Sequence, residues 1–491
     1  MTIEKVLGTP LVFAFLCLIP CSKRMTRVIF TAGAILAALG AWSFVFGVSG
    51  SPRVFAFGGN LMMDSLSAVF VLLITGVGVL SSAYAGGYLF RDGETAIPSV
   101  KLRRYAFFFH LFLFTMLLTV FSNNLGIMWI AIEGTTLASA FLVNTDDKKS
   151  SIEAAWKYLI ICSVGISLAF FGVILAYYSA VARTAVGESG LLLNWTFLLE
   201  NARQLDPKII QLAFIFVLVG YGTKAGLAPF HSWLPDAHSQ APAPVSALLS
   251  GVLLSCAVLG ILRFHILTTA ATGSNFSGTL LVVFGVFSVM IAAPFILEQK
   301  DYKRMLAYSS VEHMGLAAVG LGFGSAIGIY GALLHIVNHA FTKSLLFFTT
   351  GHILYLFQTK EISQVKGIFR RSPFLGAIFF AATLAIAGMP PFNIFVSEFL
   401  ILSAGFQAKK FVACGILLVL LSLVFIGFLK HSNQMTFGES EKVPVKPKSL
   451  VMNGVLLVGM VLILMMGFYI PGPLQHLLQE ASRVAAGGAS L

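Results

Sequence analysis

Apolar runs of about 20 residues, repeated along the whole chain, constrain its fold more than any other feature. A run of that length spans the hydrocarbon core of a bilayer, which is about 30 Å thick. The chain has 491 residues, of which 57% are hydrophobic and only 11% are charged, whereas a soluble domain has about 25% charged residues. We therefore predict an all-α, polytopic membrane protein. The fourteen expected spans cover residues 6–20, 28–48, 61–90, 106–121, 123–143, 156–180, 208–230, 242–268, 279–297, 305–324, 326–357, 374–403, 411–430 and 450–470.

Two of these spans contain an internal break. Glycine and proline interrupt the seventh span at Gly226 and Pro229 and the twelfth at Gly388, Pro390 and Pro391. Irregular backbone at membrane depth must line a cavity or pack within protein. Because the breaks occupy related places, spans four to eight and nine to thirteen are predicted to form two inverted five-helix repeats. The predicted segments are an N-terminal three-helix segment (1–105), the first repeat (106–268), the second repeat (279–430) and a C-terminal helix with its tail (431–491).

Basic residues in the loops predict the orientation. Alternate loops, taken from residues 21–27 onward, hold 20 lysines and arginines, and the loops on the other side hold eight. The larger set includes Arg91, Lys442, Lys446 and Lys448. The positive-inside rule places the larger set in the cytoplasm and both termini outside it. The net charge of +12 is accounted for by this asymmetry, and we expect no nucleic-acid partner.

Cysteine usage gives no metal or redox framework. Five cysteines are present and none forms a CxxC pair. Cys17 and Cys21 lie one helical turn apart, which is compatible with half of a metal site, but two small apolar residues at a helix end are the better interpretation. No glycine-rich phosphate loop is present. We therefore expect no cofactor and no metal on this chain.

The ionisable residues inside the spans are the candidates for function, because a charge at the bilayer centre costs on the order of 2.5–3.5 kcal/mol. Glu133 lies in the middle of the fifth span, and Lys224 directly precedes the first break. The two side chains are predicted to pair across the bundle. A lysine that alternates between paired and unpaired states can take up and release a proton, because desolvation opposes its charge when the partner is absent. The alternative is a static ion pair that fixes helix packing.

The eleventh span holds a row of titratable residues. His335, His339 and Lys343 are spaced by four residues, so they lie on one helix face over roughly 12 Å. Such a row is what a proton wire needs, since histidine titrates near neutral pH. Glu398 follows the second break and is the natural terminal donor or acceptor. Its alternative role is a permanently protonated, hydrogen-bonded carboxyl.

Several further residues are accessory candidates. Glu312 and His313 either continue the polar path or contact a neighbouring subunit, and His231 and His238 follow the first break. Arg263 lies near the outer end of its span, and we expect its side chain to reach the interface.

Four stretches resemble the antiporter-like subunits of complex I, of multisubunit sodium/proton antiporters and of membrane-bound group 4 nickel–iron hydrogenases. The resemblance covers about residues 60 to 430 and is greatest for the F-type subunit of hydrogenase-4 and formate hydrogenlyase-like complexes, because of the segment VEHMG and the histidines before FTKS. The stretches are KAGLAPFHSWLPDAHSQAPAPVSALLSGVLL, DYKRMLAYSSVEHMG, HIVNHAFTKSLLFFTTGH and AGMPPFNIFVSEF.

The resemblance implies fourteen helices, two inverted repeats and a central polar axis in a bacterial or archaeal cell membrane. It assigns Glu133 and Lys224 to a switching pair, the row on the eleventh span to a relay, and Glu398 to its end. Many relatives have a histidine or lysine in the eighth helix, where this chain has Ser250 and Ser255. A serine carries no proton charge, so continuity there would need bound water.

The function expected from the resemblance is proton or sodium translocation, driven by redox chemistry in partner subunits. Those partners would be other membrane subunits and a peripheral cytoplasmic arm with iron–sulfur clusters and a nickel–iron centre. Whether the chain counts as part of an enzyme therefore depends on the partners. The competing functions are a non-pumping membrane anchor of such a complex, a stand-alone antiporter, and a subunit of an inorganic-carbon uptake complex.

Overall fold

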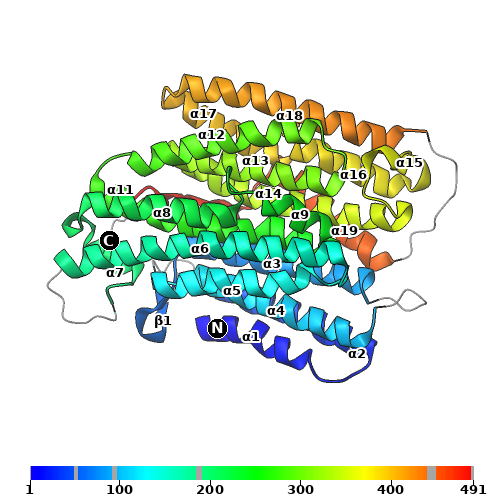
Figure 1. Ribbon diagram of the computed structural model, residues 1–491, viewed down its shortest axis with the longest axis horizontal. Coiled ribbons are helices and arrows are strands. Elements are labelled where there is room, and N and C mark those ends of the chain that lie inside the picture. The colour runs from blue at the N-terminus through cyan, green and yellow to red at the C-terminus, as the bar shows by residue number, and fades with distance from the viewer. Residues whose placement is uncertain (1, 49–52, 91–96, 184–190, 440–448, 488–491) are drawn as a thin grey trace.

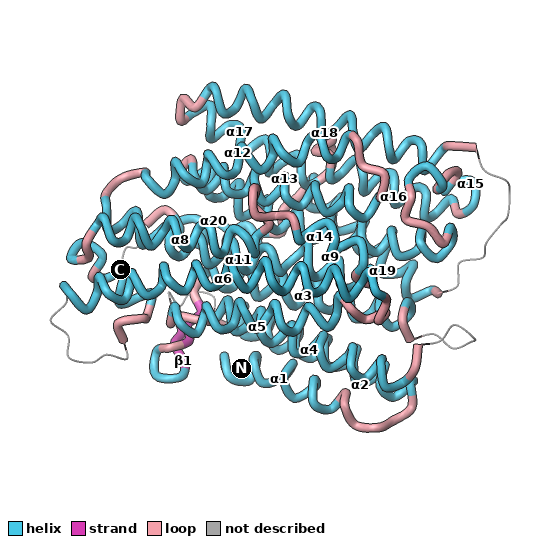
Figure 2. The backbone as a smooth tube through the Cα atoms, in the orientation of Figure 1, coloured by secondary structure: helices cyan, strands magenta, loops and turns pink. Residues whose placement is uncertain are grey.

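The computed structural model describes residues 2–48, 53–90, 97–183, 191–439 and 449–487 (Figure 1). It is almost entirely helical, and the helices lie roughly side by side along the long axis (Figure 2). In the described residues, ten helices are long and apolar enough to cross a membrane. The chain is therefore an all-α, polytopic membrane protein, as predicted.

The elements run in chain order as follows. The first half contains α1 (Ile3–Leu16), α2 (Lys23–Gly47), β1 (Val54–Ala56), η1 (Phe57–Gly59), β2 (Leu61–Met63), α3 (Ser65–Tyr88), α4 (Ser99–Phe121), α5 (Leu125–Val143), α6 (Lys149–Arg183), α7 (Trp195–Glu200), η2 (Ala202–Gln204), α8 (Pro207–Ala225), α9 (Trp233–Gln240), α10 (Ala243–Leu248), η3 (Leu249–Leu253) and α11 (Leu254–Thr272). The second half contains α12 (Phe276–Leu297), α13 (Tyr302–Gly322), α14 (Ala326–Phe357), η4 (Ile362–Gln364), α15 (Ile368–Arg371), α16 (Pro373–Ile386), α17 (Asn393–Gln407), α18 (Phe411–Phe437), α19 (Leu450–Phe468) and α20 (Gly472–Ala485).

Every expected span coincides with a helix or a broken pair of helices, but the number that crosses the bilayer stays a prediction. Helices α13 and α14 have 21 and 32 residues, which is long enough to cross a bilayer. Because of their polar and charged residues, they are not among the ten helices that are also apolar enough. Two features were not predicted. The start of the third span is an antiparallel hairpin in which Val54 pairs with Met63. The amphipathic helix α20 follows α19 and packs on α3 and α14.

Polar residues cap many of the helices at the ends of the spans. Their side chains accept hydrogen bonds from the first free backbone N–H groups, which have no partner within the helix. Such caps occur at Ser22, Asp64, Asn124, Asp206, Asp301, Ser325 and Ser449. The caps let the apolar runs begin as helices without leaving bare amide groups near the lipid.

The two breaks have the same local structure. Each has the sequence Gly-x-x-Pro-Phe, and each glycine takes a left-handed conformation that other residues rarely adopt, with φ of +76° at Gly226 and +74° at Gly388. The same three backbone hydrogen bonds recur in both. They run from Gly226 N to Thr223 O, Leu227 N to Gly222 O and Phe230 N to Leu227 O, and from Gly388 N to Ala385 O, Met389 N to Leu384 O and Phe392 N to Met389 O. This match supports the two inverted repeats, which stay a prediction.

The centre of the bundle is formed by two long helical segments. Residues 243–268 of the continuous segment α10–η3–α11 are all buried within the chain, and α14 packs against α3, α10, α13, α16, α17 and α19. The remaining helices surround these two (Figure 1). This arrangement places α14, with its predicted row of titratable residues, inside the protein rather than against lipid.

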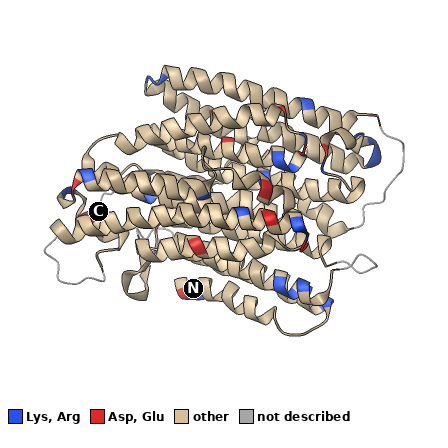
Figure 3. Cartoon of the chain, viewed as in Figure 1, with Lys and Arg blue, Asp and Glu red and all other residues tan. Residues whose placement is uncertain are grey.

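Basic side chains gather at one end of the bundle. Figure 3 shows them clustered at α15 and at the start of α2, both at the right-hand end. This distribution agrees with the predicted asymmetry, and the side of the membrane to which that end belongs stays a prediction. Arg91, Lys442, Lys446 and Lys448, which contribute to the predicted count, lie outside the described residues.

Candidate functional site

Lys224 lies fully buried in the last turn of α8, just before the first break. Its ammonium donates hydrogen bonds to the hydroxyl of Thr136 on α5 (2.8 Å) and to that of Tyr158 on α6 (2.6 Å). The ammonium also lies 4.6 Å from the centre of the Tyr158 ring, at a distance typical of a cation–π contact. Three helices thus hold one buried cation by neutral groups.

Glu133 does not contact Lys224 directly. Thr136 lies between them, because its hydroxyl donates to one carboxylate oxygen of Glu133 (3.3 Å) and accepts from Lys224. Ser163 on α6 donates to the other carboxylate oxygen (2.6 Å). The direct pair expected from the sequence is therefore replaced by a bridge through one hydroxyl group. We call these residues, with Tyr158 and its partner Ser139 (2.6 Å), the Lys224 cluster.

Glu133 is only partly buried, and its face of α5 is otherwise apolar. Ile130 and Leu137, one turn before and one turn after it, are 60% and 50% exposed. A carboxylate at this depth is costly if it faces lipid. The face around Glu133 therefore fits contact with another membrane protein better than contact with lipid.

The row on α14 is fully buried, as the spacing predicted. His335, His339 and Lys343 have no exposed side-chain surface. Lys343 donates to the backbone carbonyl of Leu306 (2.5 Å) and to the hydroxyl of Ser309, both on α13. Neither ring nitrogen of His339 has a hydrogen-bond partner. The row thus combines one bonded cation with one histidine whose nitrogens are both unpaired.

A hydrogen-bonded chain crosses from α13 through α14 to α17. His313 Nδ1 lies 3.1 Å from His335 Nε2, and His335 Nδ1 lies 3.0 Å from Ser397 Oγ. Ser397 also accepts from the amide of Asn338 (3.2 Å) and donates to the carbonyl of Ile394 (2.9 Å). The accessory residue His313 is therefore part of the row, and Ser397 connects the row to the turn that precedes Glu398.

Glu312, His313 and Glu398 gather at the end of this chain. One ligand-type atom from each lies within 4.8 Å of the others, and the carboxylate of Glu312 is 3.5 Å from His313 Nε2. The carboxylate of Glu398 lies against Gly388, where a Cβ atom would be only 2.2 Å from it. A glycine in the second break is thus required by its conformation and by this close approach. These residues and those of the α14 row form the histidine cluster: Ser309, Glu312, His313, His335, His339, Lys343, Ser397 and Glu398.

The two serines of the eighth span have different surroundings. Ser250 lies in the π-helical turn η3 and hydrogen-bonds to Ser310 on α13 (2.7 Å). Ser255 donates to the carbonyl of Gly251 in its own segment (3.2 Å). Single π-helical turns often occur at functional sites. Of these two serines, Ser250 is therefore the one that forms a hydrogen bond to α13, the helix that carries Glu312 and His313.

Among the described residues, no hydrogen bond joins the Lys224 cluster to the histidine cluster. Ser310 neighbours Ser309 of the histidine cluster in sequence, but Ser250 has no bond to Lys224. A proton that moved between the clusters would need water at this point, as expected from the serines.

The segment after the first break, which includes α9, holds the remaining candidates. His238 is fully buried and stacks on Phe347 of α14 with ring centres 4.9 Å apart, and neither of its ring nitrogens has a partner. His231 is partly exposed and packs edge-on against Tyr308. His238 thus faces the α14 helix, whereas His231 lies at the edge of the break.

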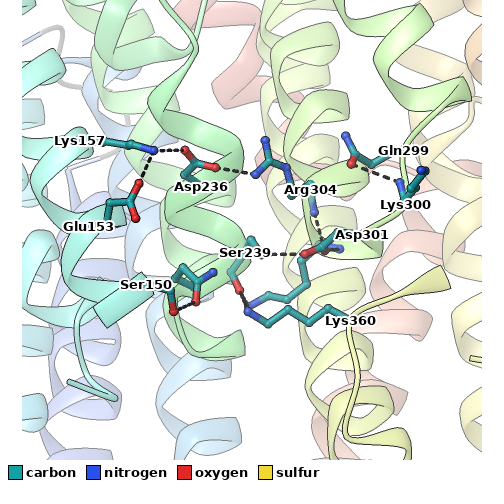
Figure 4. Close-up of polar contacts among 12 residues, drawn as sticks. Ser150, Glu153, Lys157, Asp236, Ser239, Gln299, Lys300, Asp301, Arg304 and Lys360 are labelled. Carbon is teal, nitrogen blue, oxygen red and sulfur yellow. Dashed lines mark hydrogen bonds and ion pairs between the residues drawn. The ribbon is translucent and has the colours of Figure 1, made fainter. Parts of the chain in front are cut away.

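A network of charged and polar side chains holds α9 against α6, α13 and the loop after α14 (Figure 4). Asp236 pairs with Arg304 on α13 (2.6 Å) and with Lys157 on α6 (3.5 Å). Ser239 donates to Asp301 (2.8 Å), and its carbonyl accepts from Lys360 (2.5 Å). Burial lowers the pKa of Lys360, which lies in the loop after α14. These contacts hold the segment after the first break against the second half of the protein.

Arg263 does not reach the interface, so the expectation that its side chain extends there is wrong. The residue is 1% exposed, and its guanidinium makes a bidentate ion pair with Asp64 (2.6 and 2.8 Å) and a hydrogen bond to Ser67 (3.0 Å). It also lies 4.3 Å from the ring centre of Trp195. Asp64 is the N-cap of α3, so its carboxylate has partners on both sides.

Comparison with known proteins places the chain in a family. The family model for the membrane subunits described as NADH:quinone oxidoreductase/Mrp antiporter matches residues 122–426, and a model for the N-terminus of complex I chain 5 matches residues 52–96. The first match covers more than half of the chain. The chain belongs to this family. The matched region contains every residue of the two clusters.

Individual members of this antiporter family support the assignment. A hydrogenase-4 component F homolog from Methylacidiphilum infernorum is 39% identical over 430 residues, which cover 87% of this chain and 88% of the relative. The fold agrees with a subunit of the archaeal membrane-bound sulfane sulfur reductase (TM-score 0.86, 23% identity, 99% and 97% covered). It also agrees with a subunit of the Mrp complex from Dietzia (TM-score 0.85, 19% identity, 100% and 98% covered).

The sequence analysis missed several residues that complete the clusters. Thr136 and Asn338 each lie three positions after a chosen residue on the same helix, so this spacing could have identified them. Ser397 is adjacent to Glu398 in sequence, and adjacent positions on a helix do not face each other. Tyr158 lies on a helix with no chosen residue, and nothing in the sequence near it indicates that it binds Lys224. Asp236 follows the end of the seventh expected span, and the sequence analysis did not distinguish it from other charged residues in loops.

Proposed function

We propose that the chain is the ion-translocating, antiporter-like subunit of a membrane-bound respiratory complex. In this proposal, redox chemistry in partner subunits drives protons, or sodium ions, through the buried Glu, Lys and His residues. The electron carriers, which are iron–sulfur clusters and a nickel–iron centre, belong to a peripheral cytoplasmic arm. Family membership and the resemblance to a hydrogenase-4 component F homolog support this assignment, which gives the chain itself no redox centre.

The observation that carries the proposal is the hydrogen-bonded chain from His313 through His335 to Ser397. It joins α13, α14 and α17 inside the bundle. A neutral imidazole accepts a proton on one nitrogen and releases one from the other, so a histidine with partners on both nitrogens passes protons along a line. The line ends beside Glu398 at the second break, where residues such as Met389 are exposed.

The Lys224 cluster supplies the switch in this proposal. Lys224 is fully buried and is held by the hydroxyls of Thr136 and Tyr158 rather than by a direct counter-ion. Movement of Glu133 toward or away from Thr136 alters how well the lysine charge is stabilised, and a neutral lysine has released its proton. The partly exposed position of Glu133 makes it sensitive to a neighbouring membrane subunit.

The test replaces Glu133 or Lys224 by alanine in the native complex. Membrane vesicles are then assayed for redox activity with a soluble donor and for the gradient with a pH-sensitive dye. We expect an assembled complex with redox activity and a reduced gradient. Lys208→Ala is the matched control, because Lys208 lies at the exposed start of the same helix and should leave the gradient intact. If Glu133→Ala and Lys224→Ala both generate the wild-type gradient, the switch is wrong.

A second candidate function is a membrane anchor that does not translocate ions. The absence of a direct hydrogen bond between the two clusters in the described residues favours it, because a path without bound water would be interrupted there. Wild-type vesicles separate the two functions, since an anchor supports redox turnover without ion uptake. A protonophore then distinguishes protons from sodium, because it abolishes a proton gradient and leaves sodium uptake in place.

A further inference from the structure

We propose that Glu312, His313 and Glu398 form a binding site for a divalent transition-metal ion such as Zn²⁺. The sequence predicts no metal on this chain, and the translocation proposal does not need one. The inference therefore goes beyond the proposed function, and metal binding is expected whether or not the chain carries ions.

The donor set fits such an ion. Two carboxylates and one imidazole are nitrogen and oxygen ligands of the kind that Zn²⁺ takes. Zinc bonds of about 2.0–2.2 Å place two tetrahedral ligands about 3.4 Å apart, and Glu312 and His313 already present their atoms at 3.5 Å. The third ligand, Glu398, comes from a different helix and lies within 4.8 Å of both. A small rotation of its side chain closes the site.

Two buried polar atoms of these groups have no hydrogen-bond partner in the part of the chain that the structure describes. They are the Oε2 atom of Glu312 and the Nε2 atom of His313. Buried polar atoms are nearly always partnered in native proteins. Two such atoms that face each other within 4 Å, rather than one isolated atom, indicate a shared ligand between them.

One arrangement of protons along the hydrogen-bonded chain leaves His313 Nε2 able to bind a metal. When the hydroxyl of Ser397 donates to the carbonyl of Ile394, the proton in the bond between His335 and Ser397 belongs to His335 Nδ1. His335 Nε2 is then an acceptor, and His313 donates to it from Nδ1. In this arrangement, His313 Nε2 has a lone pair available 3.5 Å from the Glu312 carboxylate. A proton or a metal ion between these two atoms would stabilise them, and the experiment below distinguishes the two.

Second-sphere contacts and charge also suit a metal. A histidine that binds a metal usually donates its other ring nitrogen to a partner that fixes its orientation, and His335 has this role here. Two carboxylates balance the two positive charges of the metal, and the charge of Lys343 is held separately by its hydrogen bonds to α13. Lys343 has no acceptor atom and donates to α13, so it is not a ligand. The fourth position is open to water or to the neighbouring His339.

Occupancy would have a mechanical and a chemical consequence. A metal held by Glu312, His313 and Glu398 fastens α13 to α17 next to the second break. It also occupies the atoms that would take up protons in the proposed relay. Glu398 is 9% exposed and lies beside a break whose residue Met389 is 39% exposed, so this break is the expected entry route.

The test uses the purified complex after treatment with a chelator. Equilibration with Co²⁺, which reports coordination through its visible absorption, should produce the bands of a low-symmetry nitrogen and oxygen site in the wild type. The absence of protein-bound bands overturns the proposal without any variant. Zinc content after equilibrium dialysis should be higher by one ion per chain than in Glu312→Gln and in His313→Asn.

A matched control separates this site from general binding. His265 is a buried histidine bonded to Ser277 (2.8 Å) outside both clusters, and His265→Asn should retain the wild-type zinc content. If Glu312→Gln or His313→Asn fails to assemble, Glu398→Gln provides the comparison at the partly exposed ligand. Equal zinc content in the wild type and the ligand variants overturns the proposal and indicates that Glu312 is protonated and donates to His313. Because these readouts measure metal alone, they stand apart from the gradient assay.

Discussion

The Asp64–Arg263 pair and the histidine cluster both place ionisable side chains inside the bundle, but they differ in how completely these groups are partnered. Arg263 makes three hydrogen bonds and a cation–π contact, and Asp64 also caps α3. In the histidine cluster, atoms of Glu312, His313 and His339 have no partner. A fully partnered pair has one low-energy arrangement, whereas unpartnered atoms leave room for a proton, an ion or water to come and go.

This difference teaches how to separate structural from functional charges in a membrane protein. Burial alone does not distinguish them, because Arg263 and Lys343 are equally inaccessible. The number of buried polar atoms without a hydrogen-bond partner does distinguish structural from functional charges. We therefore expect changes at the Asp64–Arg263 pair to affect stability first and changes in the histidine cluster to affect transport first.

The largest effect is expected from Arg263→Ala. Removing one partner of a buried ion pair leaves the other charge uncompensated, which costs about 3–5 kcal/mol. The folded fraction of the detergent-purified protein, followed during heating or SDS titration, should fall sharply. The double variant Asp64→Leu with Arg263→Met should regain much of the stability, since no charge is left unpaired. Equal stability of Arg263→Ala and wild type would remove the distinction drawn above.

Thr136→Val tests the bridge in the Lys224 cluster. Valine has the shape of threonine but cannot link Lys224 to Glu133, and the loss of two hydrogen bonds costs about 1–2 kcal/mol. We expect gradient formation to be about fivefold to thirtyfold slower at this energy, with the complex assembled. Thr135→Val is the control, because Thr135 donates to a carbonyl of its own helix (2.6 Å). The bridge has no role if both variants behave alike.

Ser250→Ala and Ser255→Ala form a second matched comparison. Ser250 contacts Ser310 on another helix, whereas Ser255 contacts its own segment. We expect Ser250→Ala to slow gradient formation by a few-fold, in line with a hydrogen bond worth about 1 kcal/mol. Ser255→Ala should transport at the wild-type rate. A larger effect at Ser255 would place the water path on the other side of this segment.

The smallest effect is expected at Asp147, in the loop before α6. Lys101 and Arg104 contact it and hold its pKa below the ordinary value. Its stabilising contribution is therefore present above the unfolded pKa and is lost as pH falls through the lower folded pKa. These side chains are exposed, so Asp147→Asn should cost at most about 1 kcal/mol. Thermal unfolding at low and high salt checks this, since salt should remove the difference.

The sequence predicted the parts of the fold that depend on local pattern. Hydropathy located the spans, glycine and proline located both breaks, and four-residue spacing placed His335, His339 and Lys343 on one buried face. It did not predict that Arg263 pairs with Asp64, 199 positions earlier, or that Thr136 separates Glu133 from Lys224. Such contacts depend on which helices become neighbours, and the helix order gives no distance between side chains. The roles of the site residues stay predictions.

The shared turn in the two broken helices has a consequence for how such a chain is built. In each turn, several backbone N–H groups that lose their helical partners donate to carbonyl groups a few residues away. In the first turn, the N–H of Ala228 also donates to the hydroxyl of Ser288 (2.9 Å). The interruption of each helix therefore leaves few backbone N–H groups without a hydrogen-bond partner. A chain whose broken helices are satisfied in this way gains two interruptions inside the bundle, one after Lys224 and one against Glu398, without adding a loop.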